Sequence, residues 1–120
     1  MSRATKKILT DYSSRIRQMG QDKRMLVSHV SLFTALFSCY QQNGFQNPFP
    51  ITRKTVMGFS KIASTATYHK CMKDLDAYGY ISYRPNFHPG KGSLVHWLDR
   101  DDTGRQNTGM INLPEQSTGR

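Results

Sequence analysis

Residues 64–79, STATYHKCMKDLDAYG, have the pattern of one capped helix with two unlike sides. Ser64 is a favoured N-cap residue and Gly79 is a typical stop signal, so the sequence marks both ends of the helix. Apolar residues recur at three- and four-residue spacing and predict the side that packs inward: Tyr68, Cys71 or Met72, Leu75 and Tyr78. Five polar side chains lie off this apolar stripe and are predicted to point outward: Thr65, Thr67, His69, Lys70 and Lys73.

A second, shorter helix is predicted immediately before this one, over TRKTVMGFSK. Thr52 is its N-cap, and Arg53 and Lys54 occupy its first turn. Val56 and Phe59 are expected to face the core. A tight turn then joins the two helices, which gives the pair a helix-turn-helix order.

Two strand-like runs follow the longer helix. YISYR at 80–84 and SLVHWL at 93–98 are rich in aromatic and β-branched residues, and a Gly/Pro loop separates them. His88 and Lys91 lie at the tip of this predicted hairpin, and Arg84 lies at its base. Helix, turn, helix and two-stranded ribbon, in that order, are the elements of a winged helix-turn-helix.

The residues before these elements predict a buried scaffold helix. MLVSHVSLFTALFSCYQQN, at 25–43, is apolar over a wide arc, which is typical of a helix packed against more than one element. Gly44 follows as a C-cap signal, and the two prolines of FQNPFPI predict an extended segment with a short β-bridge over 49–51. The predicted fold class is therefore mainly α with a small β-hairpin: a three-helix core plus a two-stranded wing.

These patterns divide the chain into three parts. Residues 25–98 form the predicted winged-helix domain. Residues 1–24 form a basic N-terminal arm or short helix, with a sparse apolar stripe. Residues 99–120 are polar, rich in Gly and Thr and without periodicity, which predicts a disordered polar tail.

The charge of the chain points to a polyanionic partner. The formal net charge is +9 over 120 residues. Basic residues gather in 1–30 and 50–100, whereas 31–49 hold no charged side chain. Such a balance favours DNA, RNA or an anionic membrane surface. No apolar run approaches the ~20 residues that span a bilayer, so we expect no membrane partner.

The two cysteines suggest a reducing compartment. Cys39 and Cys71 both fall on apolar sides of predicted helices, where free thiols behave as small hydrophobic groups. The basic N-terminus lacks the apolar stretch of a signal peptide. We therefore expect buried free thiols and a cytoplasmic location.

The outward side of the 64–79 helix fits the chemistry of DNA recognition. A helix enters the major groove of B-DNA, and its N-terminal turns meet base edges and phosphates. The residues expected to make these contacts are Ser64, Thr65, Thr67, His69, Lys70 and Lys73. Phosphate contacts are expected from Arg53 and Lys54, and contacts to the neighbouring groove from Arg84, His88 and Lys91. The alternative is an ordinary solvated helix face that happens to be basic.

Other site chemistries find little support. GKGS at 90–93 lacks the spacing of a phosphate loop and precedes a strand. His69 and Cys71 lie two positions apart, so on a helix they diverge by roughly 200° and cannot share a metal ion. Asp74 and Asp76 diverge in the same way. We therefore expect no enzymatic activity, no cofactor, no metal and no small-molecule ligand.

Residues 28–98 also resemble a group of small winged-helix proteins found on bacterial mobile elements and in their hosts. VSLFTALF and NPFPITRK carry part of the resemblance, and SKIASTATYHKCMKDLDAYGYI at 60–81 is its most specific part. The resemblance implies that residues 64–73 form the groove-facing helix and that 84–92 form the wing. It also implies a transcriptional regulator, or an accessory factor for replication or excision.

The sequence thus predicts sequence-specific binding of double-stranded DNA, as a transcriptional regulator. One alternative is an accessory factor for replication or excision of a mobile element, and another is a winged-helix protein-interaction module. RNA binding is disfavoured, because the aromatic residues are expected in the core instead of on a sheet that stacks bases. A homodimer at two half-sites stays open, with residues 1–24 as the candidate dimer element.

Overall fold

The structure is a computed structural model that describes residues 2–85 and 92–98. Within these residues the chain forms four helices and a three-stranded antiparallel sheet. In chain order the elements are α1 (Arg3–Gln21), α2 (Val27–Gln42), β1 (Phe49–Ile51), α3 (Arg53–Ser60), α4 (Thr65–Ala77), β2 (Ile81–Arg84) and β3 (Ser93–Trp97). The predicted tail over 99–120 lies outside the described residues.

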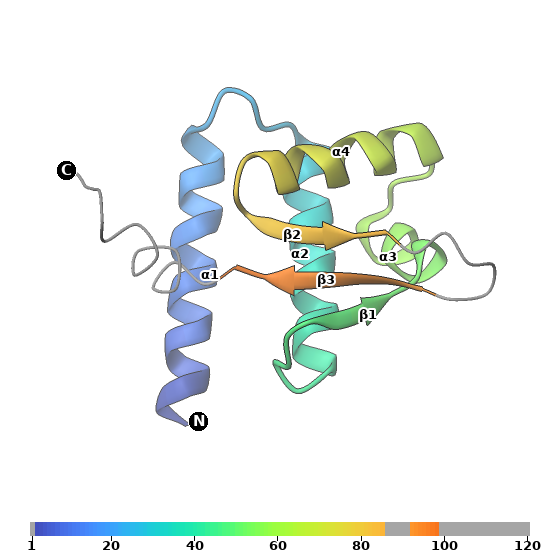
Figure 1. The fold of residues 1–120 in the computed structure, drawn as a ribbon. Helices are drawn as coiled ribbons and strands as arrows, with labels where there is room; N and C mark the ends of the chain where they lie inside the picture. The colour runs from blue at the N-terminus through green and yellow to red at the C-terminus, as the bar shows by residue number, and fades with distance from the viewer. Residues whose placement is uncertain (1, 86–91, 99–120) are drawn as a thin grey trace.

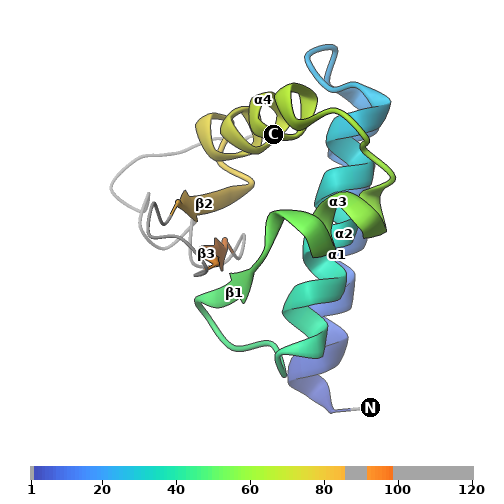
Figure 2. The same cartoon turned by 90° about the vertical axis from the view of Figure 1, so that its right-hand side faces the viewer.

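The elements surround α2. The sheet covers one side of α2, α4 lies beside the sheet, and α1 and α3 flank α2 on opposite sides (Figures 1 and 2). The fold is thus mainly helical with a small antiparallel sheet, as the sequence predicted at this coarse level. None of the described helices combines the length and the hydropathy that crossing a bilayer requires.

α2 is the buried scaffold helix that the sequence predicted. Seven of its 16 residues are buried: His29, Leu32, Phe33, Ala35, Leu36, Cys39 and Tyr40. Cys39 on α2 and Cys71 on α4 are both buried free thiols, as predicted. Burial raises the pKa of the Cys39 thiol, so this side chain packs in its neutral form.

Aromatic side chains fill the space between α2, α1 and the sheet. Trp97 stacks on Phe33 and Tyr40 at ring-centroid distances of 4.6 and 5.3 Å. Tyr12 of α1 stacks on Phe37 of α2 at 4.0 Å. Phe33, Tyr40 and Trp97 therefore lie in the core, with Tyr12 and Phe37 packed against it, and each ring buries a large apolar area.

Side-chain caps begin α3 and α4 where the sequence predicted them. The Thr52 hydroxyl accepts a hydrogen bond from the Thr55 backbone N–H at 3.2 Å. The Ser64 hydroxyl accepts from the Thr67 backbone N–H, also at 3.2 Å. These caps satisfy N–H groups that no carbonyl of the same helix can reach. Gly79, just beyond α4, has a φ of +84°, which side chains disfavour.

Phe59 does not face the core, so that expectation was wrong. Its side chain is 50% exposed, whereas Val56 is fully buried. Val56 and Ser60 are the buried residues of α3 and set its inward direction. Phe59 lies about 80° from the middle of that buried side, because neighbouring residues are spaced by 100° around a helix.

The sheet has one strand more than the predicted two-stranded ribbon. Its order is β1-β3-β2, so the short bridge predicted over 49–51 is an edge strand of the same sheet. Phe49 of β1 and Tyr83 of β2 lie opposite Val95 of β3 from its two sides. Pro50 is tolerated in β1 because an edge strand can leave one side of its backbone unpaired.

Gly92 brings the start of β3 close to β1. A Cβ added at this position would stand 2.3 Å from the carbonyl oxygen of Ile51. Backbone atoms cannot yield to such an overlap without moving the strand. The missing side chain of Gly92 therefore permits the β1–β3 pairing.

Arg15 connects α1 to both strands of the hairpin. Its side chain is almost fully buried, and its guanidinium donates to the carbonyl oxygens of Tyr80 at 2.7 Å and Gly79 at 3.2 Å. It also donates to the carbonyl oxygen of Leu98. Tyr80 directly precedes β2 and Leu98 directly follows β3. One side chain therefore holds the two strand ends together beside α1.

Three aromatic rings complete the surroundings of this guanidinium. Its central carbon lies 5.4, 5.2 and 5.8 Å from the ring centroids of Phe33, Tyr80 and Trp97. Cation–π attraction and hydrogen bonds to carbonyl groups together offset the cost of burying the charge. α1 is thus packed into the folded body, and it contributes the buried side chains of Arg15 and Met19.

Replacing Arg15 by methionine should destabilise the protein strongly. Arg15→Met keeps a long side chain but leaves buried carbonyl groups without a donor, so we expect the free energy of unfolding to fall by roughly 3 kcal/mol. Urea unfolding followed by Trp97 fluorescence and far-UV circular dichroism measures this change. Arg17→Met, on the exposed side of the same helix, is the control and should change stability by less than about 0.5 kcal/mol. Equal stability of the two variants would contradict the role given to Arg15.

Replacing Gly92 by alanine should weaken the β1–β3 pairing. The added methyl group would overlap the Ile51 carbonyl, so we expect a loss of about 1–3 kcal/mol and faster amide exchange in β3. Gly58→Ala is the matched control, because a Cβ there meets nothing within 4 Å. That substitution should stabilise α3 by up to about 1 kcal/mol. The prediction fails if both glycine variants gain stability.

Candidate nucleic-acid interface

The outward side of α4 carries most of the residues that the sequence assigned to DNA. Thr65, Lys70 and Lys73 are exposed, and His69 is half-buried. The opposite side is packed, as predicted, through Tyr68, Cys71, Met72 and Leu75. α4 therefore has one side anchored in the core and one side that can meet a ligand.

Ser64 and Thr67 form the N-terminal cap of α4, so part of their hydrogen-bonding capacity is used within the helix. The Ser64 oxygen and the Thr67 backbone N–H are bonded to each other in the cap. The Thr67 side chain is half-buried, because it lies about 200° from Thr65 around the helix and turns partly inward. The Ser64 hydroxyl proton remains able to donate to a ligand at the helix start.

The start of α3 presents two cations where a helix favours anions. Arg53 and Lys54 are exposed in its first turn, which holds no acidic residue. A cation at the positive end of a helix dipole destabilises the helix by about 0.3–1 kcal/mol, whereas an anion there stabilises it. An anion bound there would remove this cost, since backbone N–H groups and cations would both face it.

Tyr68 shows that α3, α4 and β2 converge. Burial raises the pKa of its phenol, the nearby Tyr83 raises it further, and the charge of Arg53 lowers it. The phenol of an α4 residue thus lies within electrostatic reach of the α3 start and of β2. Arg84, the residue after Tyr83, is exposed at the end of β2. Arg53 therefore lies near the N-terminal half of α4, whereas the side chain of Arg84 points to the opposite face of the sheet from that of Tyr83.

Two of the predicted contacts cannot be placed. His88 and Lys91, assigned to the tip of the hairpin, lie outside the described residues.

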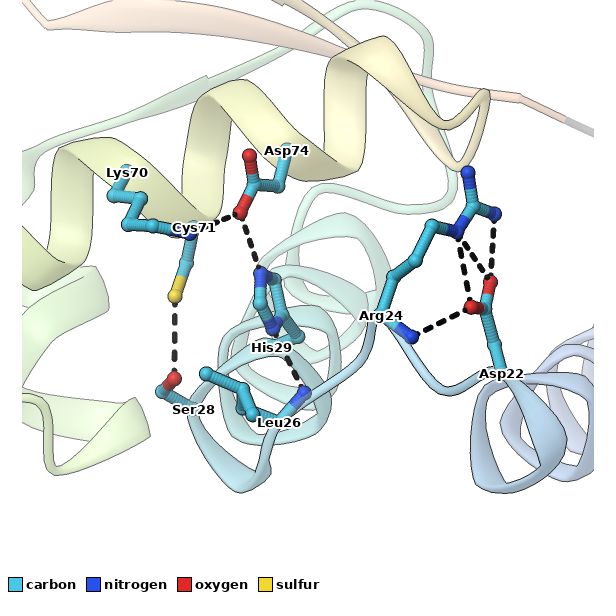
Figure 3. A network of polar contacts seen from close by, with 8 residues as sticks. All are labelled: Asp22, Arg24, Leu26, Ser28, His29, Lys70, Cys71 and Asp74. Carbon is cyan, nitrogen blue, oxygen red and sulfur yellow. Dashed lines mark hydrogen bonds and ion pairs between the residues drawn. The ribbon is translucent and has the colours of Figure 1, made fainter.

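Lys70 is held in an ion pair that sequence reasoning missed. Its ammonium donates to Asp74 Oδ2 at 2.9 Å, and the same oxygen lies 2.8 Å from His29 Nε2 (Figure 3). The hydrogen bond to Asp74 raises the pKa of Lys70. Hydrogen bonds from His29 and then Lys70 lower the pKa of Asp74. A phosphate that binds Lys70 must therefore compete with the Asp74 carboxylate.

The bonding of His29 sets its tautomer. Its Nδ1 accepts from the Leu26 backbone N–H at 2.9 Å, so in the neutral ring Nε2 carries the proton and donates to Asp74. The imidazole thereby joins the start of α2 to the middle of α4. His29 and Asp74 are 45 residues apart, and no local pattern in the sequence indicates that they meet.

Two further contacts hold α4 in place, one before Asp74 in the sequence and one after it. The Cys71 thiol donates to Ser28 Oγ at 3.2 Å. The Arg24 guanidinium lies over the Tyr78 ring, 3.9 Å from its centroid. It also forms an ion pair with the Asp22 carboxylate at 2.7 Å (Figure 3). This ion pair lowers the pKa of Asp22 to about 2. The C-terminal half of α4 and the residue after it are thus joined to Ser28 and His29 at the start of α2 and to Arg24 in the α1–α2 connection.

The described part of the chain offers no cluster that resembles a metal site. Within 2–85 and 92–98, no three His, Cys, Asp or Glu side chains gather closely enough to hold an ion. His69 lies on the outward side of α4, whereas Cys71 is buried on the opposite side.

No family model, no curated protein and no solved structure matches this chain. The resemblance of residues 28–98 to small winged-helix proteins of mobile elements is thus a hypothesis that rests on the residue pattern alone.

The Asp74 network predicts a specific acid titration. The Asp74 carboxyl should titrate below its ordinary pKa of 3.8. Because the folded-state pKa is lowered, the network stabilises the fold above that ordinary value, and its contribution is lost as the pH falls through the lowered pKa. In a carbon-detected NMR titration, His29→Leu should raise the Asp74 pKa more than Lys70→Met does, since the bond from His29 has the larger effect. A wild-type Asp74 that titrates at or above 3.8 would contradict the network.

Proposed function

We propose that this protein binds duplex DNA sequence-specifically through a winged helix-turn-helix, with α4 as the recognition helix. The order of elements from α2 to β3 supports this fold, because α3 and α4 follow each other across a short connection, both pack on α2, and two antiparallel strands come next. The observation that carries the proposal is the outward side of α4. There a capped helix start is followed by a side, opposite the packed one, on which Thr65, Lys70 and Lys73 are exposed and His69 is half-buried.

In this proposal the first turns of α4 enter the major groove. Thr65 and His69 lie one turn apart on the outward side and reach base edges. Lys73 follows one turn later and extends the contact along the groove. Ser64 caps the helix and donates its hydroxyl proton to a phosphate. Thr67 donates its own hydroxyl proton to a phosphate in the same way.

Lys70 has a different role from Lys73. Asp74 already orients the ammonium group of Lys70. This fixed orientation favours a contact between Lys70 and a flanking phosphate over a contact between Lys70 and a base edge. When a phosphate displaces the carboxylate, Asp74 keeps its hydrogen bond from His29. The exchange therefore leaves no charged oxygen without a partner, and its cost stays small.

The remaining cations supply affinity for the DNA backbone. Arg53 and Lys54 hold phosphates beside the groove, while Arg84, together with His88 and Lys91, contacts the neighbouring groove. Such contacts position the protein on the duplex and weaken with rising salt, but they carry little sequence information.

Specific binding without catalysis fits a transcriptional regulator in the bacterial cytoplasm. An accessory factor for replication or excision of a mobile element is the alternative, which the resemblance of residues 28–98 also allows. The two roles need the same interface on α4. A transcriptional regulator only occupies its DNA site, whereas an accessory factor takes part in a reaction that rearranges or copies the DNA.

Protein interaction is a second candidate function, favoured by one apolar surface. Leu26 and Val27 are 59% and 87% exposed at the start of α2. They border a hollow of about 430 Å³, whose lining includes Met19, Met25 and Val30. Contiguous exposed apolar surface is typical of protein contacts. This surface shares no residue with the outward side of α4, so both functions can coexist.

Selection from a pool of random duplexes tests the proposal. At ~0.15 M salt, the purified protein should enrich a motif whose binding exceeds that of unrelated duplexes. His69→Ala or Lys73→Ala should weaken binding to that motif by about 1–3 kcal/mol, which is roughly 5- to 150-fold. Lys23→Ala, which removes an exposed lysine outside α4, is the charge-matched control and should leave motif preference unchanged.

Two results would contradict the proposal. One is a retained pool without any shared motif, and the other is equal motif binding by the Lys73→Ala and Lys23→Ala proteins. Either result would shift attention to the apolar surface around Leu26 and Val27.

A further inference from the structure

The outward side of α1 is a second cationic surface. We call it the α1 cationic face and define it by its four exposed basic residues: Arg3, Lys6, Lys7 and Arg17. Exposed Thr10 and Ser13 lie between them and add hydroxyl groups. Asp11 is the acidic residue of this helix, but its side chain is only 11% exposed and lies 4.0 Å from the guanidinium of Arg15. The exposed side of α1 therefore offers Arg3, Lys6 and Arg17 to a ligand, while Lys7 already has an interaction within the protein.

These cations are not placed to stabilise α1. Its first turn holds no acidic residue and its last turn holds no basic one. Arg3 and Lys6 lie in the first turn, where positive charge opposes the helix dipole. Solvated surfaces usually intersperse both signs, often as pairs four residues apart that stabilise the helix. Asp11 and Arg15 form such a pair on the inner side of α1, but Arg3 and Lys6 face the positive end of the helix dipole with no acidic residue in their turn, which points to an external anionic partner.

The packing of α1 narrows the choice of that partner. Its apolar residues are turned into the body, where Tyr12 packs against the core and Met19 is buried. A helix that lies on a membrane needs its apolar side free to enter the acyl boundary. A second copy of this chain would bring like charges together if it docked through the same face. The phosphate backbone of a nucleic acid is anionic and needs no free apolar side of the helix, so neither objection applies to it.

The α1 cationic face and the start of α3 point in different directions. Ser31 of α2 donates to the Ser60 carbonyl oxygen of α3, whereas Phe33 stacks with Tyr12 of α1 at 5.7 Å. Ser31 and Phe33 are two positions apart, so they diverge by about 200° around α2. Figures 1 and 2 agree, since they place α1 and α3 on opposite sides of α2. One straight duplex cannot lie against both surfaces.

We propose that the α1 cationic face binds the backbone of a second duplex segment, so that one molecule bridges two segments of DNA. The inference rests on the proposed function for the first segment, which α4 would hold. α1 has 19 residues and is about 28 Å long, close to the roughly 34 Å of one B-DNA turn. Its contacts are to phosphates, so the second segment needs no particular sequence.

A two-duplex capture assay tests the bridge. An immobilised duplex carries the motif selected by α4, and a fluorescent duplex without the motif is offered in solution. The test variant combines Arg3→Ala, Lys6→Ala and Arg17→Ala, all on the exposed side of α1. The matched control combines Arg53→Ala, Lys54→Ala and Lys73→Ala, which also removes three cations. Circular dichroism and sedimentation velocity establish that each protein is folded and report its oligomeric state.

The α1 variant should bind the immobilised motif within about twofold of wild type, but it should retain at least about tenfold less of the second duplex. The salt slope of second-duplex capture should fall by about one unit for each cation removed. The control variant should lose motif binding instead. The two surfaces would then be shown to act on different duplexes.

Each other outcome overturns the bridge. An α1 variant that bridges as well as wild type overturns the inference and leaves the proposed function intact. A control variant that keeps motif binding, while the α1 variant loses all binding, makes α1 the primary DNA surface and defeats both proposals. Capture of the second duplex only by a dimer, through two α4 helices, also overturns it. So does α1-dependent binding to phosphatidylserine vesicles without any bridging.

Discussion

The buried guanidinium of Arg15 is the interaction on which the arrangement of α1 and the hairpin depends. It spans the gap between a helix and two strand ends, because its fork of donors can reach several carbonyl groups at once. A neutral side chain of similar length offers no such donors. The same residue thereby decides where α1 lies and how the base of the hairpin is held. Both proposed DNA surfaces inherit their orientation from that arrangement.

Among the described residues, the acidic side chains are used in contacts within the protein, whereas most basic side chains are exposed. The four acidic side chains of these residues all make intramolecular contacts: Asp11 with Arg15, Asp22 with Arg24, Asp74 with His29 and Lys70, and Asp76 with the Tyr83 backbone N–H. Asp74 and Asp76 thus join different elements, Asp11 and Asp22 pair within their own segments, and most cations remain exposed. An excess of unmatched positive charge costs stability through self-repulsion, and a polyanion relieves that cost.

Two opposed DNA surfaces would change the expected biological role. A regulator needs to occupy one site, whereas joining or looping DNA requires two segments to be held at once. Bridging through α1 would therefore favour the accessory alternative over simple regulation. The apolar surface at the start of α2 would remain available to a protein partner in either role, because neither DNA surface uses Leu26 or Val27.

Local signals in the sequence were sufficient for α2, α3 and α4, for the caps at Thr52 and Ser64 and for the packed side of α4, but they left open whether residues 1–24 form an arm or a short helix. The cap at Ser64 could be predicted because it depends on residues within one turn of each other. Phe59 was misplaced, because α3 packs against α2 through one narrow side that periodicity does not locate. Only the tertiary structure brought Arg15 to the strand ends and His29 to Asp74. Those contacts join distant parts of the chain, and a pattern of neighbours in sequence cannot specify which partners a fold brings within hydrogen-bonding distance.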